Sequence, residues 1–573
     1  MKREAVLHIP LSNYAFSISD NEVVFRIRTG KDDISSCVLC YGDRSCRRTP
    51  VDFTSVTMEK VAFSELFDYY EVTLGSPYRR ICYYFALTDN NGESILYYGD
   101  QFENETTAVR SEYFQFDYNQ PSDRAVVPGW VKESIVYNIF PDSFATGRRY
   151  ISDRAVTVIS DGLEHRGLRG GTINGIRDNL DYISTLGFTC IYINPVFSAG
   201  EYHKYDLIDY FHIDPAFGTD EDFRLLVEEA HRMGIRVIID GVFNHIGWKS
   251  DIFRSVVKDG RKSPYWSWFM HLEDPVVVPD NWDEYPRYEC FGYERMMPKL
   301  NLKNSEAASY FCSVGTHWVE KYDIDGWRLD VACEVCDDFW RQFRKSIKAV
   351  KSDCVLIGEV WESAGHWLCG DMFDSTMNYD MRRYSERFFA SGNISAAEFN
   401  SRVTEMLMRY RTQITYSQLN LLDSHDVSRF LSLCGGNRDY YALSLVFLFT
   451  FVGTPCVFYG DEKGLEGVLE DEYRQPMKWD GGDEEIYCLF RKLTALRRKY
   501  KALTEGTFRA DTIDNDGVYS YVRKKGNEII RIVLNRSRET VDKPSGEILL
   551  SRHIRENGIG PSGYAIVKVR EWQ

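Results

Sequence analysis

The chain has 573 residues, 44% of them apolar, and a formal net charge of −16. A single hydrophobic core stops growing at roughly 250–300 residues, so this length predicts several domains. The acidic balance argues against a nucleic-acid or anionic-membrane partner, because both need a basic protein face.

The N-terminus shows no export signal, because Met1-Lys2-Arg3-Glu4 leads directly into alternating residues without an apolar core. The apolar stretch 442–459 approaches the length of a membrane span, but Gly453-Thr454-Pro455 divides it. We expect a buried helix followed by a buried strand there. We therefore expect no membrane partner and a cytoplasmic protein.

The 14 cysteines are scattered along the chain. Cys37/Cys40 and Cys333/Cys336 are CxxC pairs, but zinc needs four clustered ligands, and nothing else in the sequence pairs these sites. We expect free buried thiols in a reducing compartment, and no metal.

Residues 1–120 are predicted to form an N-terminal β-sandwich. Runs such as 23–28 and 80–85 are rich in β-branched and aromatic residues and are bounded by turn residues such as Asn90-Asn91-Gly92. Pro121-Ser122-Asp123 resembles a linker.

From about residue 125, apolar runs of strand length alternate with helical patterns such as 223–233 and 339–350, which is typical of parallel β/α units. Such units over residues 121–245 and 302–500 predict a closed (β/α)8 TIM barrel. An open doubly wound sheet is the main alternative, but no glycine-rich dinucleotide loop follows the first strand. The predicted strands are Ile135–Phe140, Cys190–Asn194, Val237–Asp240, Gly326–Asp330, Val355–Val360, Met377–Tyr379, Leu419–Asp423 and Cys456–Tyr459.

Two further regions complete the predicted architecture. Residues 246–301, with Trp266, Trp268 and Trp282, form an inserted domain after strand 3, which places it on the face of the barrel where active sites occur. Residues 501–573 read as strands again and predict a C-terminal antiparallel β domain.

Four acids stand where predicted strands end: Asp240, Asp330, Glu359 and Asp426. A charge after an apolar strand costs several kcal/mol unless water or partners solvate it, so four at one rim indicate function. A retaining glycosidase needs two carboxyl groups roughly 5–5.5 Å apart, one ionised and one protonated. Arg328 lies two residues before Asp330, so it points to the same face of the strand and is expected to keep that acid ionised.

Around these acids the chain resembles glycoside hydrolase family 13, the α-amylase family, and within it the neopullulanase, cyclomaltodextrinase and maltogenic amylase group. The similarity covers nearly the whole length and follows four motifs in the family's order at strand ends. A fifth motif, 297–301 (MPKLN), resembles the signature of the inserted domain in this group. The four motifs are 240–245 (DGVFNH), 326–334 (GWRLDVACE), 358–361 (GEVW) and 424–426 (SHD).

The resemblance implies a retaining α-glucan hydrolase with Asp330 as nucleophile, Glu359 as general acid/base and Asp426 as third carboxylate. It implies an oligosaccharide substrate: maltodextrin, cyclodextrin or pullulan, with α-1,6 cleavage and transglycosylation left open. Further residues are expected to bind or position the sugar: Arg328, His245, His425, Tyr205, Asp240, Asn244, Glu334, Trp361, Glu470 and Arg474.

Among these, His245 and His425 are expected to donate hydrogen bonds to the sugar in the −1 position, and Tyr205 to stack on that ring. Arg474 resembles an arginine that binds the non-reducing side, and Glu470 stands where relatives usually carry Asp. For Tyr205 and Arg474, plain packing or a surface ion pair is the alternative.

Several alternatives stay open at this stage. The same site could serve a glucan transglycosylase or isomerase, and a non-catalytic glucan-binding homologue or an unrelated metal-dependent hydrolase would be a different class. The resemblance also implies a homodimer in which residues 1–120 cover the partner's site. The alternative is that these residues form a merely structural or weakly sugar-binding module.

Relatives with a calcium site on the first barrel loop carry Asn and Asp after the first strand and an Asp after a Gly-Gly pair. Here the loop carries Arg148 and Arg149 before Tyr150, and Gly170-Gly171 is followed by Thr172. Calcium prefers several hard oxygen ligands with net negative charge. We expect this site to be absent, and hence no cofactor.

Overall fold

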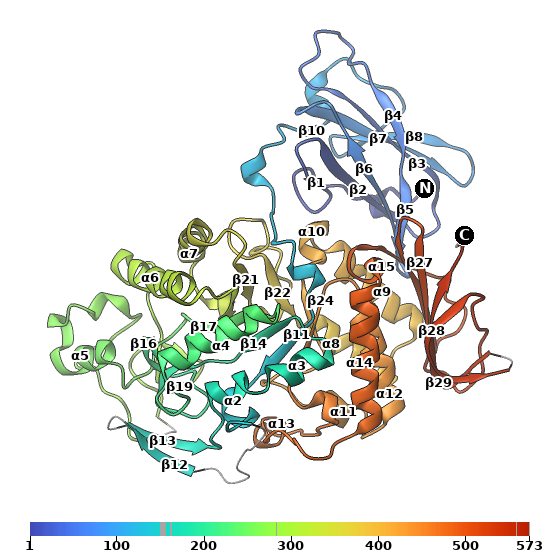
Figure 1. Cartoon of the computed structure of the whole chain (residues 1–573). Helices are drawn as coiled ribbons and strands as arrows, with labels where there is room; N and C mark the ends of the chain where they lie inside the picture. The colour runs from blue at the N-terminus through green and yellow to red at the C-terminus, as the bar shows by residue number, and fades with distance from the viewer. Residues whose placement is uncertain (149–155, 161–162, 282–283, 557, 572–573) are drawn as a thin grey trace.

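The computed structural model describes residues 1–148, 156–160, 163–281, 284–556 and 558–571, with the backbone alone given for 156–160 and 163–166. Arg149, Tyr150 and Trp282, named above, lie outside the described residues. The chain forms an N-terminal β domain, a central barrel and a C-terminal β domain that packs beside the barrel (Figure 1).

The N-terminal domain is a sandwich of two antiparallel sheets, as predicted. The sheets run β1-β2-β6-β5 and β4-β3-β7-β8-β9, with β10 added beside β7. Their facing sides enclose a core that includes Phe25, Leu39 and Tyr83. The strands are β1 (Ala15–Ser17), β2 (Glu22–Gly30), β3 (Ile34–Asp43), β4 (Thr54–Thr57), β5 (Glu59–Phe63), β6 (Phe67–Gly75), β7 (Ile81–Asp89), β8 (Ser94–Tyr98), β9 (Gln101–Glu103) and β10 (Phe114–Phe116).

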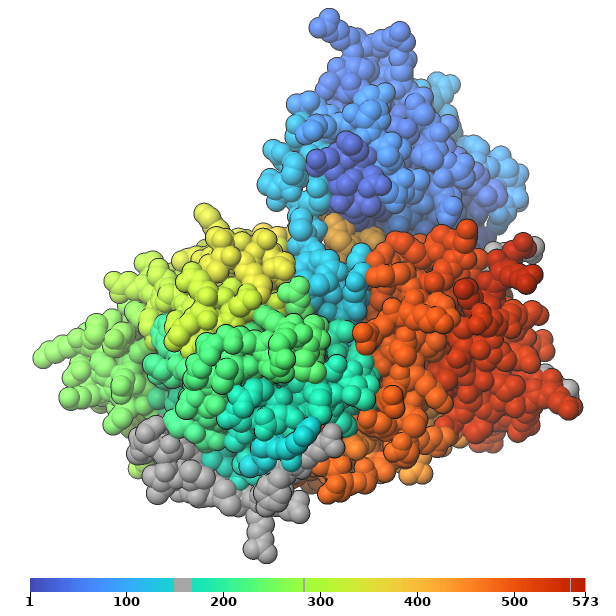
Figure 2. Space-filling view, in the orientation of Figure 1, coloured from blue at the N-terminus to red at the C-terminus, as the bar shows by residue number. Residues whose placement is uncertain are grey.

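This sandwich projects from the body of the molecule (Figure 2) and is fastened to it by polar contacts. Arg26 is 2% exposed, donates hydrogen bonds to the carbonyl oxygens of Met408 and Tyr410 in the barrel, and pairs with Glu71 at 2.7 Å. The Asn400 amide donates to the carbonyl of Phe63 at 2.7 Å. Arg26 also donates to the carbonyl oxygen of Asn13 in its own domain. A buried guanidinium that hydrogen-bonds carbonyls of both domains holds one domain against the other.

The central domain is a closed parallel barrel with strands in chain order, which confirms the barrel over a doubly wound sheet. Each predicted run overlaps one barrel strand. Helices cover the outside of a barrel and side chains fill its inside, so its strands are apolar on both faces and appear in the sequence as continuous apolar runs. The strands are β11 (Val136–Ile139), β14 (Cys190–Ile193), β17 (Arg236–Val242), β20 (Gly326–Asp330), β21 (Val355–Gly358), β22 (Ser375–Asn378), β23 (Leu419–Leu421) and β24 (Thr454–Phe458).

Helices surround the barrel (Figure 1). The stretch that resembles a membrane span folds as buried α12 followed by β24, as expected. Among the described helices, none combines the length and apolar character that crossing a bilayer requires. Helices of the barrel domain include α3 (Leu180–Leu186), α4 (Asp220–Arg232), α6 (Ser305–Tyr322), α7 (Asp337–Val350), α8 (Tyr379–Ser385), α9 (Ala396–Met408), α12 (Arg438–Thr450) and α14 (Glu484–Lys499).

Between β17 and α6 the inserted segment forms α5 (Asp251–Asp259) and a short hairpin, β18 (Cys290–Phe291) with β19 (Glu294–Pro298). Trp268 is buried in the core, whereas Phe291 of the hairpin lines a cavity at the carboxyl ends of the barrel strands. The C-terminal domain is one antiparallel sheet, as predicted, in the order β25 (Thr507–Ala510), β26 (Val518–Lys525), β27 (Glu528–Asn535), β29 (Gly558–Val569), β28 (Glu547–Arg555).

All 14 cysteines are free thiols. Cys37 and Cys40 are buried in β3, as expected, but the expectation of burial is wrong for Cys333 and Cys336. Both are exposed because the chain turns after β20 at the rim of the barrel, in a 3₁₀ turn (Ala332–Glu334), before α7 begins.

Candidate active site

The strand-end acids meet at one end of the barrel, around a cavity of about 530 Å³. Asp240 lies in β17, Asp330 ends β20, Glu359 follows β21, and Asp426 follows β23. Parallel strands bring their carboxyl ends to the same rim, so acids from distant parts of the sequence converge there. The cavity is lined by His203, Tyr205, His245, Phe291, Glu294, Met297, Asp330, Val331, Cys333, Glu334, Glu359, Trp361, Asp426, Glu470 and Arg474.

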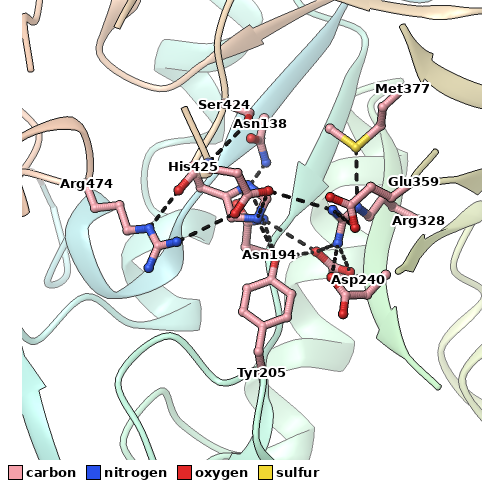
Figure 3. A network of polar contacts seen from close by, with 12 residues as sticks. Asn138, Asn194, Tyr205, Asp240, Arg328, Glu359, Met377, Ser424, His425 and Arg474 are labelled. Carbon is pink, nitrogen blue, oxygen red and sulfur yellow. Dashed lines mark hydrogen bonds and ion pairs between the residues drawn. The ribbon is translucent and has the colours of Figure 1, made fainter. Parts of the chain in front are cut away.

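Arg328 is the centre of this group (Figure 3). Its side chain is fully buried, and its Nη1 donates to Asp240 Oδ1 at 2.9 Å and to Asp330 Oδ1 at 2.8 Å. Its Nη2 lies 2.9 Å from Glu359 Oε2 and 3.9 Å from Asp426 Oδ2. Asp330 and Glu359 therefore lie against the two terminal nitrogens of one guanidinium and face the same cavity.

Two further donors hold Glu359. The backbone amide of Val331 donates to Glu359 Oε2 at 2.9 Å, and the Trp361 indole donates to Oε1 at 3.0 Å. The Trp361 ring stacks on Tyr379, with ring centroids 3.7 Å apart. Val331 adopts a left-handed conformation with φ of 44°, which is costly for a β-branched residue. The backbone next to Asp330 is thus strained, and its amide points at the second acid.

Burial raises the pKa of Asp330 well above its ordinary value, with Arg328 opposing and Glu359 adding to the rise. Burial likewise raises the pKa of Asp240, against Arg328. Burial raises the pKa of Asp426 to about 7; the Glu359 carboxylate adds to this, and Arg328 and Arg474 oppose it. Arg328 thus opposes the rise in the pKa of Asp330, in the direction expected of a fixed cation, but burial acts against it. One guanidinium faces four carboxyl groups, so their protonation is linked.

The histidines of the site are neutral. Burial lowers the pKa of His245 to about 3 and that of His425 well below its usual value. His245 Nε2 lies 3.2 Å from the Tyr205 carbonyl oxygen, and its ring stacks on Phe291 of the inserted hairpin. The Tyr205 hydroxyl donates to Asp240 Oδ2 at 2.9 Å and lies 2.5 Å from His425 Nε2. A neutral imidazole carries a single N–H, and that of His245 donates to the Tyr205 carbonyl, because a carbonyl oxygen can only accept.

One wall of the cavity carries Glu334, which is 45% exposed. Lys299 of the inserted domain pairs with the Glu334 carboxylate at 3.0 Å and donates to the Asn244 side chain. Lys299 thus ties the inserted domain to the segment after β17 and to the turn after β20.

The opposite wall is built on α13 (Glu470–Tyr473) and the residue after it. Arg474 donates to the His425 carbonyl at 2.7 Å and lies 3.6 Å from Asp426. It also pairs with Glu470, which accepts a hydrogen bond from the Tyr202 hydroxyl at 2.7 Å.

All residues predicted for the site therefore gather at one place. Those that do not line the cavity stand directly behind it: Asp240, Asn244, Arg328 and His425. Sequence reasoning missed Asn194, Lys299 and Phe291. Asn194 is a polar residue that follows an apolar strand, which is the same signal that the four acids gave. Lys299 stands inside the 297–301 motif, whereas no local signal identifies Phe291.

Among the described residues, no cluster of three or more His, Cys, Asp or Glu side chains could hold a metal ion. Near the first barrel loop, both Asp142 carboxylate oxygens accept hydrogen bonds from the backbone amide of Arg169, at 2.8 and 3.0 Å, and the Gly170 amide donates at 3.1 Å. Arg148 pairs with Asp181 at 3.1 Å. Both Asp142 oxygens are thus engaged by N–H donors. A calcium site would instead place further oxygen ligands beside them.

Comparison with known proteins agrees with this geometry. The family model for the α-amylase catalytic domain matches residues 138–522, and that for the α-amylase N-terminal Ig-like domain matches residues 1–120. A cyclomaltodextrinase of Geobacillus thermopakistaniensis is 38% identical over 95% of this chain and 93% of its own length. Neopullulanase 2 of Thermoactinomyces vulgaris is 36% identical over 100% of this chain and 99% of its own length. A solved cyclomaltodextrinase structure superimposes with a TM-score of 0.88 at 34% identity, covering 100% of this chain and 98% of that one.

The raised pKa of Asp426 gives a stability prediction. Because it rises from 3.8 to about 7 on folding, the wild-type protein loses stability as pH rises through that range, whereas Asp426→Asn does not. At about 1.4 kcal/mol per pKa unit, we expect the substitution to raise the free energy of unfolding by about 4 kcal/mol at pH 8 and to have little effect at pH 4. Thermal unfolding of both proteins across this range checks it, and a difference that does not vary with pH would contradict it.

Proposed function

Because the chain belongs to the α-amylase family, glycoside hydrolase family 13, we propose that it is a retaining hydrolase of α-1,4-glucosidic bonds in short glucans: maltodextrins, cyclodextrins or pullulan. The relatives named above act, by their names, on cyclic maltodextrins and on pullulan. The cavity suits an uncharged, hydroxyl-rich substrate, since Tyr, His and Trp side chains lie among its acids.

One observation carries the proposal: Asp330 and Glu359 lie at 2.8 and 2.9 Å from the two nitrogens of Arg328. Two carboxyl groups held by one guanidinium and facing one cavity supply the nucleophile and the proton donor that a double displacement needs. Asp330 is assigned as the nucleophile, because its Oδ1 accepts a hydrogen bond from the fixed cation, which favours the carboxylate form against the effect of burial.

In the first step, Asp330 attacks the anomeric carbon while Glu359 gives its proton to the departing glycosidic oxygen, which leaves a covalent β-glucosyl enzyme. In the second step, Glu359 takes a proton from water, which attacks the same carbon and releases Asp330 and an α-product. Asp426 accepts hydrogen bonds from sugar hydroxyls beside this centre, and the neutral imidazole of His425 stands next to it.

Replacement of either acid tests these roles. Asp330→Asn removes the nucleophile and Glu359→Gln removes the proton donor, so each is expected to lower kcat on maltotriose by about 10³-fold or more. Asp371→Asn, a surface carboxylate that pairs with Arg341, is the matched control and should retain the native rate.

The stereochemical course provides the second arm. Proton NMR of the first product formed should show the α-anomer, because two displacements retain configuration. A β-anomer, or near-native turnover by either acid variant, would refute the assignment.

We also propose that the chain lacks the calcium site of its relatives. The N–H donors around Asp142 and the Arg148–Asp181 pair support this. Incubation with excess EGTA should leave the melting temperature unchanged, since no bound ion would be removed. A large drop in the melting temperature, reversed by added calcium, would contradict it.

A homodimer that involves residues 1–120 is proposed as the assembly. Ile9 and Leu11 support it, because they lie together before β1 and are 47% and 52% exposed. Sedimentation velocity of the full chain should give twice the mass of 66.6 kDa, and replacement of both residues by Ser should shift it toward the monomer. A monomeric wild-type protein at micromolar concentration would count against this assembly.

The cytoplasm is the proposed location. The 14 free thiols support this, because they suit a reducing compartment.

A further inference from the structure

Asn194 lies behind the cavity and has no place in the mechanism above. It follows β14 directly, is fully buried, and lies beside His425 in the polar network of Figure 3. Its amide nitrogen is 2.9 Å from His425 Nδ1 and 3.2 Å from Nε2. It also lies 3.1 Å from the Tyr192 hydroxyl, 3.3 Å from the Tyr205 hydroxyl and 3.4 Å from Asp240 Oδ2.

The orientation of this amide follows from its neighbour Asn138. The Asn138 amide group lies 3.2 Å from the backbone carbonyl of Tyr192, which can only accept, so this group is the NH₂. The same NH₂ lies 3.0 Å from the side chain of Asn194, which must therefore present its oxygen. The NH₂ of Asn194 then points toward His425 and donates to Nδ1, the nearer ring nitrogen.

The other side of the imidazole is fixed independently. The Asp240 carboxylate accepts hydrogen bonds from Arg328 and from the Tyr192 hydroxyl. Because a carboxylate can only accept, the Tyr205 hydroxyl, 2.9 Å from Asp240 Oδ2, donates to it as well. The Tyr205 oxygen has then given its only proton and can only accept from His425 Nε2, at 2.5 Å. Both arguments lead to the same tautomer, with the proton on Nε2 and a lone pair on Nδ1.

We propose that Asn194 is a positioning residue that holds His425 as the neutral Nε2–H tautomer. His425 Nε2 also lies 3.1 Å from Asp426 Oδ2, so the nitrogen that carries the proton stands beside the third carboxylate and the sugar position next to it. Without the Asn194 donor, a proton on Nδ1 is no longer disfavoured, and Nε2 loses the N–H that the Tyr205 oxygen accepts. The catalytic part of this inference rests on the proposed function.

The charges around His425 maintain its neutral form. Arg328 and Arg474 add to the effect of burial in lowering its pKa, as does His203, while Asp426 and the Tyr205 hydroxyl face the ring itself. A protonated imidazole would set a third cation beside the two guanidinium groups. His425 is therefore expected not to titrate between pH 5 and 8 in the wild-type protein.

Neutron diffraction from a deuterated crystal of the wild-type chain tests the tautomer directly. The expected map shows deuterium on His425 Nε2 and none on Nδ1. Deuterium on Nδ1, with or without a second on Nε2, would overturn the inference. This result is independent of glucan hydrolysis, so it separates a failure of this inference from a failure of the proposed function.

Asn194→Asp tests the catalytic consequence, because it keeps the shape of the side chain but places an acceptor opposite Nδ1. We expect kcat on maltotriose to fall about tenfold or more, KM to change less than threefold, and a new pH dependence between pH 5 and 8 as His425 becomes protonated. A kcat within twofold of wild type would contradict it.

Asn420→Asp is the matched control for introducing a buried charge. Asn420 is a fully buried residue of β23 that contacts Val452 and Asn378. We expect this variant to lose thermal stability but to keep the wild-type pH profile. The same new pH dependence in both variants would show that it reflects the buried charge alone, and would overturn the inference. If Asn194→Asp does not fold, the neutron map of the wild-type protein still decides.

Discussion

The structure of the site depends on a single buried guanidinium. Arg328 has no solvent around it, so its charge must be compensated by protein groups, and four carboxyl groups from four segments do this. Four acids outnumber one cation, and burial raises the pKa of Asp240, Asp330 and Asp426, with neighbouring carboxylates adding to the rise at the last two. Double displacement needs two carboxyl groups in different protonation states, one able to attack and another able to donate.

Much of this arrangement could be predicted from the sequence, for identifiable reasons. The barrel strands were evident because strands buried on both faces read as continuous apolar runs, and the acids were evident because each interrupts the end of such a run. Closure of the barrel then brings Asp330, Glu359 and Asp426 together, whatever their separation in the chain. Matching motifs in the family's order added the roles that spacing alone could not give.

Other features required the coordinates. The contact of Lys299 with Glu334 depends on how the inserted domain folds back over the barrel, and no periodicity in the sequence encodes that path. Asn194 was visible as a strand-end polar residue, but its importance lies in the direction of hydrogen bonds through Asn138 and Tyr205, which only geometry provides. The exposure of Cys333 and Cys336 likewise reflects a turn at the rim rather than their own residue type.

The left-handed backbone at Val331 has a consequence for anyone who would engineer this protein. A residue in that conformation is held there by its surroundings at a cost of about 1–3 kcal/mol, and here the same peptide unit adjoins Asp330 and aims its N–H at Glu359. Sequence optimisation for thermostability would select glycine or asparagine at this position, because both accept the backbone at little cost. Such a substitution would gain heat resistance by altering the peptide unit that aligns both acids. Position 331 is therefore best left unchanged when the rest of the chain is redesigned.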